Sequence, residues 1–308
     1  MALRTKIFSF LLLAVSFYTK GQERADTAFE KTVFWSVSGN GLKDTSWLYG
    51  TAHPVFREDI LMADTVLHSL IQSSAVYFEN IPSANDDSLY RELCRMDRPK
   101  LRRLLGNACY ELLVKFLSDK NDSLLNDPQF LQLSPQYYIT KAVKHAYGPR
   151  MTSVDAFLIS IAAGNDQPMY ALDSPEMRAM MTKRVSLQQQ ADNLYFLLND
   201  FEKRMSEYEN FIKRFTQKYY AGEIGFLFTQ TNYVRYTNRL TGMSYLSRQP
   251  SGEELLDKRN SEWLPVIEKA AQKGKTFFAF GAAHLAGIKG IISLLRKKGY
   301  TVTPVMLL

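Results

Sequence analysis

The chain has 308 residues, of which 46% are hydrophobic, so it can bury a sizeable core as one large domain or two closely joined lobes. Its formal net charge is +7, but three of these charges belong to Arg4, Lys6 and Lys20 near the N-terminus, which leaves +4 for residues 22–308. This modest charge, without any block of like charges, argues against a nucleic-acid-binding protein.

Residues 1–21 are typical of an export signal. The basic Arg4 and Lys6 precede an apolar run, residues 7–18, that is shorter than the roughly 20 residues that span a bilayer. We expect cleavage before Gln22 and a periplasmic or extracellular protein with no stable membrane span. The alternative is an uncleaved N-terminal anchor. Residues 22–308 are expected to form a single domain.

A Gly-x-x-His motif follows a short apolar segment near each end of the chain. Near the N-terminus, a hairpin over residues 32–49 leads into Gly50-Thr-Ala-His53, and we expect a helix to open at Arg57. His68, on that helix, is expected to be partly buried and structural. Small residues beside both motif histidines, Thr51-Ala52 and Ala282-Ala283, are expected to leave room for an ion or a substrate.

The second motif, Gly281-Ala-Ala-His284, follows the apolar residues 276–280, which predict a strand buried on both faces. Apolar residues at helical spacing from Ile288 to Leu295 predict a helix, and another strand is expected from Tyr300. Two halves of the chain thus each deliver one histidine at the carboxyl end of a strand, where ligands bind in open α/β sheets.

Between the two motifs the pattern is mostly helical. Further strands are predicted at residues 74–79 and 167–173, and helices at 86–147 with several breaks, 154–164, from 174–176 onward, 186–220 with one break, and 253–273. The predicted fold class is therefore α/β, with a central mixed or mainly parallel sheet built from the two motif-bearing halves. A large helical layer, about residues 84–250, is inserted between them.

Three further positions carry polar groups next to apolar segments. Glu79 ends a buried strand, where a carboxylate destabilises the fold unless it is paired or bound to a cation. Arg259 and Asn260 lie beside the buried face of the last long helix, where they can hold a carboxylate or a developing oxyanion. Each of these residues also has an ordinary structural interpretation, as a capping or a solvated side chain.

The cysteine content, only Cys94 and Cys109, leaves two alternatives open. In an oxidising compartment the pair can form one disulfide. Two free buried thiols are the other alternative. The spacing does not suit a cysteine-based zinc site.

Five motifs taken together resemble the TraB/GumN family, which belongs to a wider group that includes the Tiki proteases and the pheromone-shutdown proteins. The motifs are Leu48-Tyr-Gly-Thr-Ala-His53, Tyr77-Phe-Glu79, Asp257-Lys-Arg-Asn260, Phe280-Gly-Ala-Ala-His284-Leu-Ala-Gly, and Lys298-Gly-Tyr-Thr-Val. The resemblance runs from about Thr32 to Val305. It implies one cleft between the two motif loops, and it implies that Asp155 matches a family acid with a role in substrate binding. At Asp173 the family more often has Glu.

The resemblance also implies metal-dependent peptidase activity, with manganese or cobalt preferred over zinc. Two imidazoles and a carboxylate suit a divalent ion that activates water, so His53, His284 and Glu79 are the predicted metal ligands. Glu79 is either the third ligand or the general base, and Arg259 and Asn260 complete the predicted catalytic set.

Three functional hypotheses follow from these residues. The first is an exported metal-dependent hydrolase acting on a peptide or another amide or ester. The second is an exported protein that binds a peptide or small ligand in the same cleft without turnover. The third is a metal-independent hydrolase in which a histidine acts as base together with Glu79. The sequence does not determine the oligomeric state.

Overall fold

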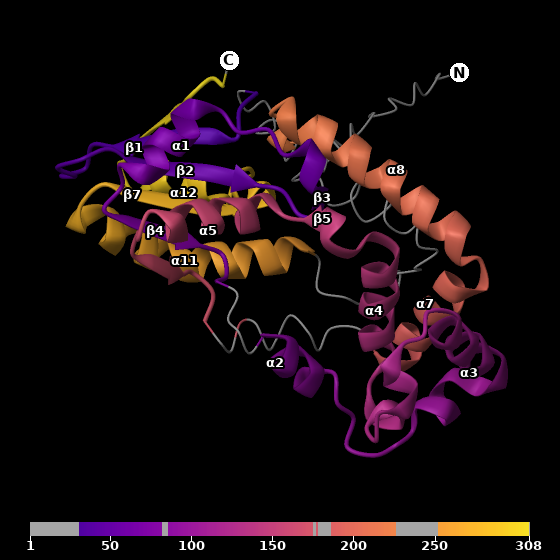
Figure 1. Cartoon of the computed structure of the whole chain (residues 1–308). Helices are drawn as coiled ribbons and strands as arrows, with labels where there is room; N and C mark the ends of the chain where they lie inside the picture. Colours follow the sequence, from indigo (N-terminus) through magenta and orange to yellow (C-terminus); the bar gives the residue numbers. More distant parts are fainter. Residues whose placement is uncertain (1–30, 82–85, 175–176, 178–185, 226–251, 308) are drawn as a thin grey trace, which may run out of the picture.

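The computed structural model describes residues 31–81, 86–174, 177, 186–225 and 252–307. The predicted signal segment, residues 1–21, lies outside the described residues. The helix start predicted at residues 174–176 lies at the edge of a described range, which ends at residue 174. Figure 1 shows a sheet with helices packed around it at one end and a separate group of helices at the other. No helix within the described ranges is both long and apolar enough to cross a bilayer.

A mixed six-stranded sheet forms the centre of the fold, as the sequence predicts. Its order is β6-β4-β7-β2-β1-β8. The strands are β1 (Phe34–Ser38), β2 (Ser46–Thr51), β4 (Ala75–Phe78), β6 (Met169–Ala171), β7 (Thr276–Gly281) and β8 (Thr301–Pro304). Strands β6, β4, β7 and β2 are mutually parallel, whereas β1 runs antiparallel to both of its neighbours. The carboxyl ends of the four parallel strands therefore share one edge of the sheet.

The two motif-bearing strands are direct neighbours. β2 pairs with β7 in parallel register, with Gly50 opposite Phe280 and Thr51 opposite Gly281. All six residues of β7 are buried, because strands cover both of its edges and helices cover both of its faces. This agrees with the near-continuous apolar sequence that predicts a strand buried on both sides.

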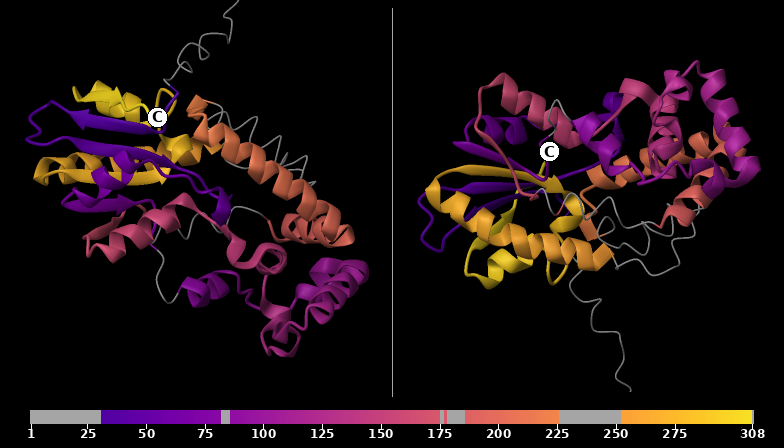
Figure 2. Two further views of the ribbon diagram at one scale, coloured as in Figure 1. Left: turned by 45° about the horizontal axis from the view of Figure 1, so that its top comes forward. Right: turned by 90° about the horizontal axis from the view of Figure 1, so that it is seen from below.

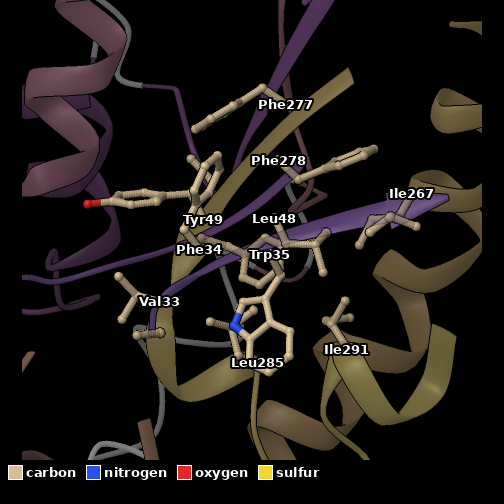
Figure 3. Close-up of a cluster of buried hydrophobic side chains, with 14 of the residues drawn as sticks. Val33, Phe34, Trp35, Leu48, Tyr49, Ile267, Phe277, Phe278, Leu285 and Ile291 are labelled. Carbon is tan, nitrogen blue, oxygen red and sulfur yellow. The ribbon is translucent and has the colours of Figure 1, made fainter. Parts of the chain in front are cut away.

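Helices cover the two faces of the sheet (Figure 2). On one side lie α1 (Asp64–Ile71) and α5 (Val154–Gly164), and on the other lie α11 (Gly252–Lys273) and α12 (Ile291–Lys297). Alternate residues of each strand point to the two faces of the sheet: Trp35 and Leu48 lie toward Ile267 of α11, whereas Phe34 and Tyr49 lie on the opposite face (Figure 3). The core is contiguous across the whole sheet.

Four of the helices inserted between β4 and β7 form a second buried cluster at the far end of the molecule. They are α3 (Leu101–Asp119), α4 (Pro135–Tyr147), α7 (Leu187–Asn199) and α8 (Phe201–Tyr220), with 3₁₀ turns at Ser123–Asn126, Phe130–Gln132 and Gly148–Arg150, and the short helix α2 (Asp86–Leu93) precedes them. The predicted breaks are confirmed: α3 is kinked at Gly106, which has a φ of 69°. α8 reaches back to the sheet, where the Tyr219 hydroxyl donates to the Tyr49 hydroxyl (3.0 Å) or to the carbonyl oxygen of Gly50 (2.9 Å).

Three details of the sequence-based prediction are wrong. No helix opens at Arg57: a short strand β3 (Val55–Phe56) pairs with β5 (Met151–Thr152), a 3₁₀ turn follows at Arg57–Asp59, and α1 begins only at Asp64. His68 is exposed on α1 instead of partly buried. The helix after His284 begins at Ile291, because a tight turn through Gly287, with a φ of 91°, and Gly290 precedes it and leaves Ile288 63% exposed.

The two cysteines are free and buried. Of the two alternatives that the sequence leaves open, the structure has the pair of thiols and not the disulfide. Burial raises the pKa of the Cys109 thiol to about 11, so this thiol stays protonated at neutral pH and is a poor nucleophile.

Gly50 of the first motif lies in close contact with the second motif loop, at Ala282 and Leu285. A Cβ added at Gly50 would lie 2.6 Å from Leu285 Cδ1 and 2.9 Å from both Cα and Cβ of Ala282. Ala52 and Ala282 are both buried. The glycine of the first motif is therefore required by close contact with the second motif loop.

This contact predicts that Gly50→Ala destabilises the protein by about 1–3 kcal/mol, the usual range for overpacking a core. Gly281→Ala is the matched control, because its added Cβ would meet nothing closer than 3.4 Å and its φ is −47°. Urea denaturation of both variants checks the prediction. Equal midpoints for the two would show that the motif loops are not tightly packed on each other.

Candidate functional site

Four acidic or histidine side chains follow the four parallel strands at their shared carboxyl edge. His53 follows β2, Glu79 follows β4, Asp173 follows β6, and His284 ends the 3₁₀ turn Ala282–His284 after β7. Backbone hydrogen bonds between adjacent strands fix the positions of Glu79 and Asp173. The Glu79 N–H donates to the Ala279 carbonyl oxygen (3.1 Å), and the Asp173 N–H donates to the Glu79 carbonyl oxygen (3.1 Å). The parallel topology thus assembles residues that are more than 200 positions apart.

Gly281 marks the point where three of these side chains meet. A Cβ placed on it would lie 3.4 Å from Glu79 Oε2, 3.6 Å from His53 Nε2 and 3.7 Å from His284 Cδ2. The Gly281 N–H itself donates to Glu79 Oε2 (3.2 Å). The structure therefore brings together the three residues that the sequence predicts as metal ligands.

Arg259 of α11 joins the buried members of this group. Its Nε and Nη2 donate to the two carboxylate oxygens of Asp173, at 3.0 and 2.7 Å. Nη2 also forms an ion pair with Glu79 Oε1, and Nη1 lies 3.1 Å from His284 Nε2. One guanidinium, itself only 4% exposed, thus contacts two carboxylates and an imidazole.

The contacts of Asn260 determine which nitrogen of His284 carries the proton. Asn260 Nδ2 faces two carbonyl oxygens, those of Lys289 (2.8 Å) and His284 (3.4 Å), so Oδ1 is the atom that faces His284 Nδ1 at 2.7 Å. An amide oxygen only accepts, so Nδ1 carries the proton and Nε2 has the lone pair. The Arg259 guanidinium then donates to that lone pair.

His284 is held as a neutral ring. It is 3% exposed, and its centroid lies 4.3 Å from that of Trp263. Burial lowers the pKa of His284 to about 3, and the positive charges of Arg259 and His53 act in the same direction against the opposing effect of Glu79. The imidazole is therefore uncharged throughout the physiological pH range.

Glu79 is held as a carboxylate. Burial acts to raise its pKa, but the charge of Arg259, followed by His284, His53 and the hydrogen bond from Arg259, outweighs burial and lowers the pKa to about 2. Asp173 has the opposite shift, because burial raises its pKa in spite of Arg259. The hydrogen bonds nevertheless identify Asp173 as ionised, because both of its oxygens accept. Oδ1 accepts from Arg259 and from Trp263 Nε1 (3.0 Å), and Oδ2 accepts from Arg259.

Asp155 lies in the first turn of α5, close to the same edge. The α5 N-terminus is attached to the first motif loop, since the Val154 N–H donates to the Ala52 carbonyl oxygen (3.0 Å). Thr51 Oγ1 donates to Asp155 Oδ1 (2.8 Å), whereas the buried Oδ2 has no hydrogen-bond partner among the described residues. Burial raises the pKa of Asp155, and the charges of His53 and Glu79 act on it in opposite directions.

We refer to these residues as the edge cluster: His53, Glu79, Asp155, Asp173, Arg259 and His284. Within it only His53 is exposed, while the Glu79 side chain is 17% exposed. The His53 side is therefore the solvent-exposed side of the cluster.

A single metal ion held by His53, Glu79 and His284 together does not fit these contacts. Such an ion needs a free lone pair on each donor at about 2 Å. The Nε2 lone pair of His284 already accepts from Arg259, and Glu79 Oε1 is also paired with Arg259. Within the described ranges, no three His, Cys, Asp or Glu side chains are grouped so that they could hold a metal ion.

The structure places Asn260 differently from its expected role at an oxyanion. Asn260 is 1% exposed, and its amide is used to hold the His284 ring and the Lys289 carbonyl oxygen. Asp173 is the residue that sequence reasoning missed. It is the last residue of the strand predicted at residues 167–173, as Glu79 is of the strand predicted at 74–79, and this equivalence is the signal that could have found it.

The pKa values of Glu79 and His284 predict how stability depends on pH. Both are lower in the folded protein than in the unfolded chain, so the unfolded chain binds more protons as the pH falls. The His284 contribution is lost from about pH 6.5 toward 3, and that of Glu79 from about pH 4.5 toward 2. Where one group dominates, the slope is about 1.4 kcal/mol per pH unit.

Denaturation of chelator-treated protein between pH 7 and 4.5 measures the His284 contribution. We expect His284→Gln to flatten the fall in unfolding free energy above pH 5, and the exposed His68→Gln to leave it unchanged. A wild-type protein equally stable at pH 7 and pH 5 would be inconsistent with a buried neutral His284.

Comparison with known proteins gives one positive result. The family model described as TraB/PrgY/gumN family matches residues 33–304, nearly the whole chain. The comparisons with curated proteins and with solved structures found no match.

Proposed function

This chain belongs to the TraB/PrgY/gumN family, and on that premise we propose that it is a hydrolase of amide or ester bonds that reacts at the edge cluster. One observation carries the proposal: the exposed imidazole of His53 and the carboxylate of Glu79, which a buried arginine keeps ionised, both lie within 3.6 Å of one point, the Cβ position of Gly281. A proton acceptor supported by a fixed negative charge, open to solvent on one side, is suited to activating water.

In the proposed reaction, His53 Nε2 accepts a proton from a water molecule as that water attacks the substrate carbonyl. The carboxylate of Glu79 stabilises the imidazolium that forms. The same proton is then donated to the leaving nitrogen or oxygen as the carbon–heteroatom bond breaks, which returns His53 to its neutral form. Glu79 itself is a poor base at neutral pH, because its pKa is about 2.

Asp155 supports the substrate-binding part of the proposal. Its buried Oδ2 lacks a hydrogen-bond partner among the described residues, and a buried carboxylate oxygen without a partner is costly. An N–H group of a peptide substrate would satisfy it. We therefore propose a peptide or related amide as the preferred substrate class.

The family resemblance supports a different version, in which a divalent ion, manganese or cobalt, activates the water and His53, Glu79 and His284 hold it. The contacts of Arg259 with Glu79 and His284 favour the version without an ion in that position. Export after cleavage before Gln22 also remains part of the proposal, and mass spectrometry of the secreted protein tests it by locating the N-terminus.

The decisive experiment assays tag-free protein on a panel of fluorogenic peptide amides and p-nitrophenyl esters, with and without excess EDTA. We expect turnover that survives EDTA. Turnover abolished by EDTA and restored by Mn²⁺ or Co²⁺ would support the ion-dependent version instead. Tight peptide binding without turnover under any of these conditions would favour a non-catalytic binding protein and contradict the proposal.

A further inference from the structure

The Arg259 guanidinium lies in the part of the edge cluster that the resemblance assigns to a metal ion. Its nitrogens contact an oxygen of Glu79, both oxygens of Asp173 and the lone-pair nitrogen of His284. Two carboxylates and a neutral imidazole are a donor set that divalent ions prefer. In this protein that set surrounds a side-chain cation.

We propose that Arg259 is the resident cation of the edge cluster, fixed by Asp173, and that His284 consequently does not ligate a metal ion. Arg259 and Asp173 are positioning residues in this arrangement. The guanidinium sets the orientation of Glu79 through their ion pair, and it keeps the second motif histidine as a hydrogen-bond acceptor.

Three contacts fix the guanidinium in its place. The paired hydrogen bonds to Asp173 set the plane of the group, since a fork of two N–H donors matches a carboxylate. Trp263 donates to the same Asp173 carboxylate, and the guanidinium carbon lies 4.5 Å from the Trp263 ring centroid. Asp173 and Arg259 are both buried, so water does not compete for these bonds.

A divalent ion at His284 Nε2 would have to displace the guanidinium that lies 3.1 Å from that nitrogen. The displaced cation would lose its bonds to Asp173 in a buried environment. An ion near the exposed His53 would not require this displacement. The inference therefore separates the two motif histidines, which the sequence pattern treats as equivalent.

Metal titration of three proteins tests this separation without any assay of activity. Tag-free, chelator-treated wild-type protein, His284→Gln and His68→Gln are titrated with CoCl₂ and MnCl₂ by calorimetry. We expect the three binding curves to agree within about twofold in Kd, or to show no binding in all three. A tenfold or larger loss of affinity in His284→Gln alone would overturn the proposal.

A measurement on the wild-type protein covers the case in which His284→Gln does not fold. Histidine-selective ¹⁵N NMR reports the protonation of each ring nitrogen and its response to one equivalent of the diamagnetic ion Zn²⁺. The proposal requires His284 to have a protonated Nδ1 and a free, hydrogen-bonded Nε2 both before and after the addition. A metal-bound shift at His284 Nε2 would contradict it.

Removing the Arg259 guanidinium is expected to create a metal site that the wild-type protein lacks. Arg259→Ala frees His284 Nε2 and the oxygens of Glu79 and Asp173, so Co²⁺ is expected to raise its thermal midpoint more than that of wild type. Arg150→Ala is the matched control, because Arg150 forms ion pairs with Glu58 and Glu209 on the surface. A folded Arg259→Ala protein with no greater response to Co²⁺ than wild type would count against the proposal.

Discussion

His53→Gln is expected to lower kcat/KM for hydrolysis by about 10²–10⁴-fold, the usual contribution of a general base. The substituted amide cannot accept and return a proton, although it is close in size to the imidazole. Because His53 is exposed, the thermal midpoint should change little. Steady-state kinetics together with thermal denaturation measure the two quantities on the same preparation.

The matched control for this experiment is His68→Gln. His68 is also exposed, on α1, and is not a member of the edge cluster. It should retain wild-type kcat/KM. If His53→Gln retained wild-type kcat/KM as well, His53 would have no role in the reaction, and the proposed mechanism would be wrong.

Arg259→Met is expected to destabilise the protein by about 3–5 kcal/mol, the usual cost of removing one partner from a buried ion pair. The methionine leaves the carboxylate of Asp173, which is 2% exposed, and that of Glu79, which is 17% exposed, without their counter-charge. Part of this cost should be recovered in the double variant Arg259→Met/Asp173→Asn, which removes one of the two uncompensated charges. Urea denaturation at neutral pH gives the three free energies.

Arg150→Met is the control for the size of this effect. Arg150 also pairs with two carboxylates, Glu58 and Glu209, but its side chain is 42% exposed. Solvent-exposed ion pairs contribute at most about 1 kcal/mol. If Arg150→Met and Arg259→Met lowered the free energy of unfolding equally, the buried guanidinium of Arg259 would not be a major stabilising group, and its proposed role would be contradicted.

Local patterns predict much of this fold. The apolar residues 276–280, the amphipathic segment 253–273 and the helix 154–164 each give their element almost to the residue, as β7, α11 and α5. Boundaries fail where the chain makes tertiary contacts that a local pattern does not contain. β3, for example, forms only because β5, about a hundred residues later, pairs with it.

The sequence predicts which residues form the candidate site better than it predicts the contacts between them. The strand-end positions of Glu79 and of the two motif histidines place them at one edge, because parallel strands share a carboxyl end. The partners of Arg259 were not predictable in the same way. They depend on how α11 lies against the sheet, which brings a helix residue to Asp173 and His284 at once.

The most direct test of whether the edge cluster acts as one catalytic unit is a double-mutant cycle on kcat/KM. It compares wild type, His53→Gln, Glu79→Gln and the double variant on one substrate, with EDTA present throughout. If Glu79 acts through His53, the double variant should lose about as much activity as His53→Gln alone, because residues that act together are strongly non-additive. Losses that simply multiply would mean that the two residues act independently, and would contradict the mechanism proposed for this site.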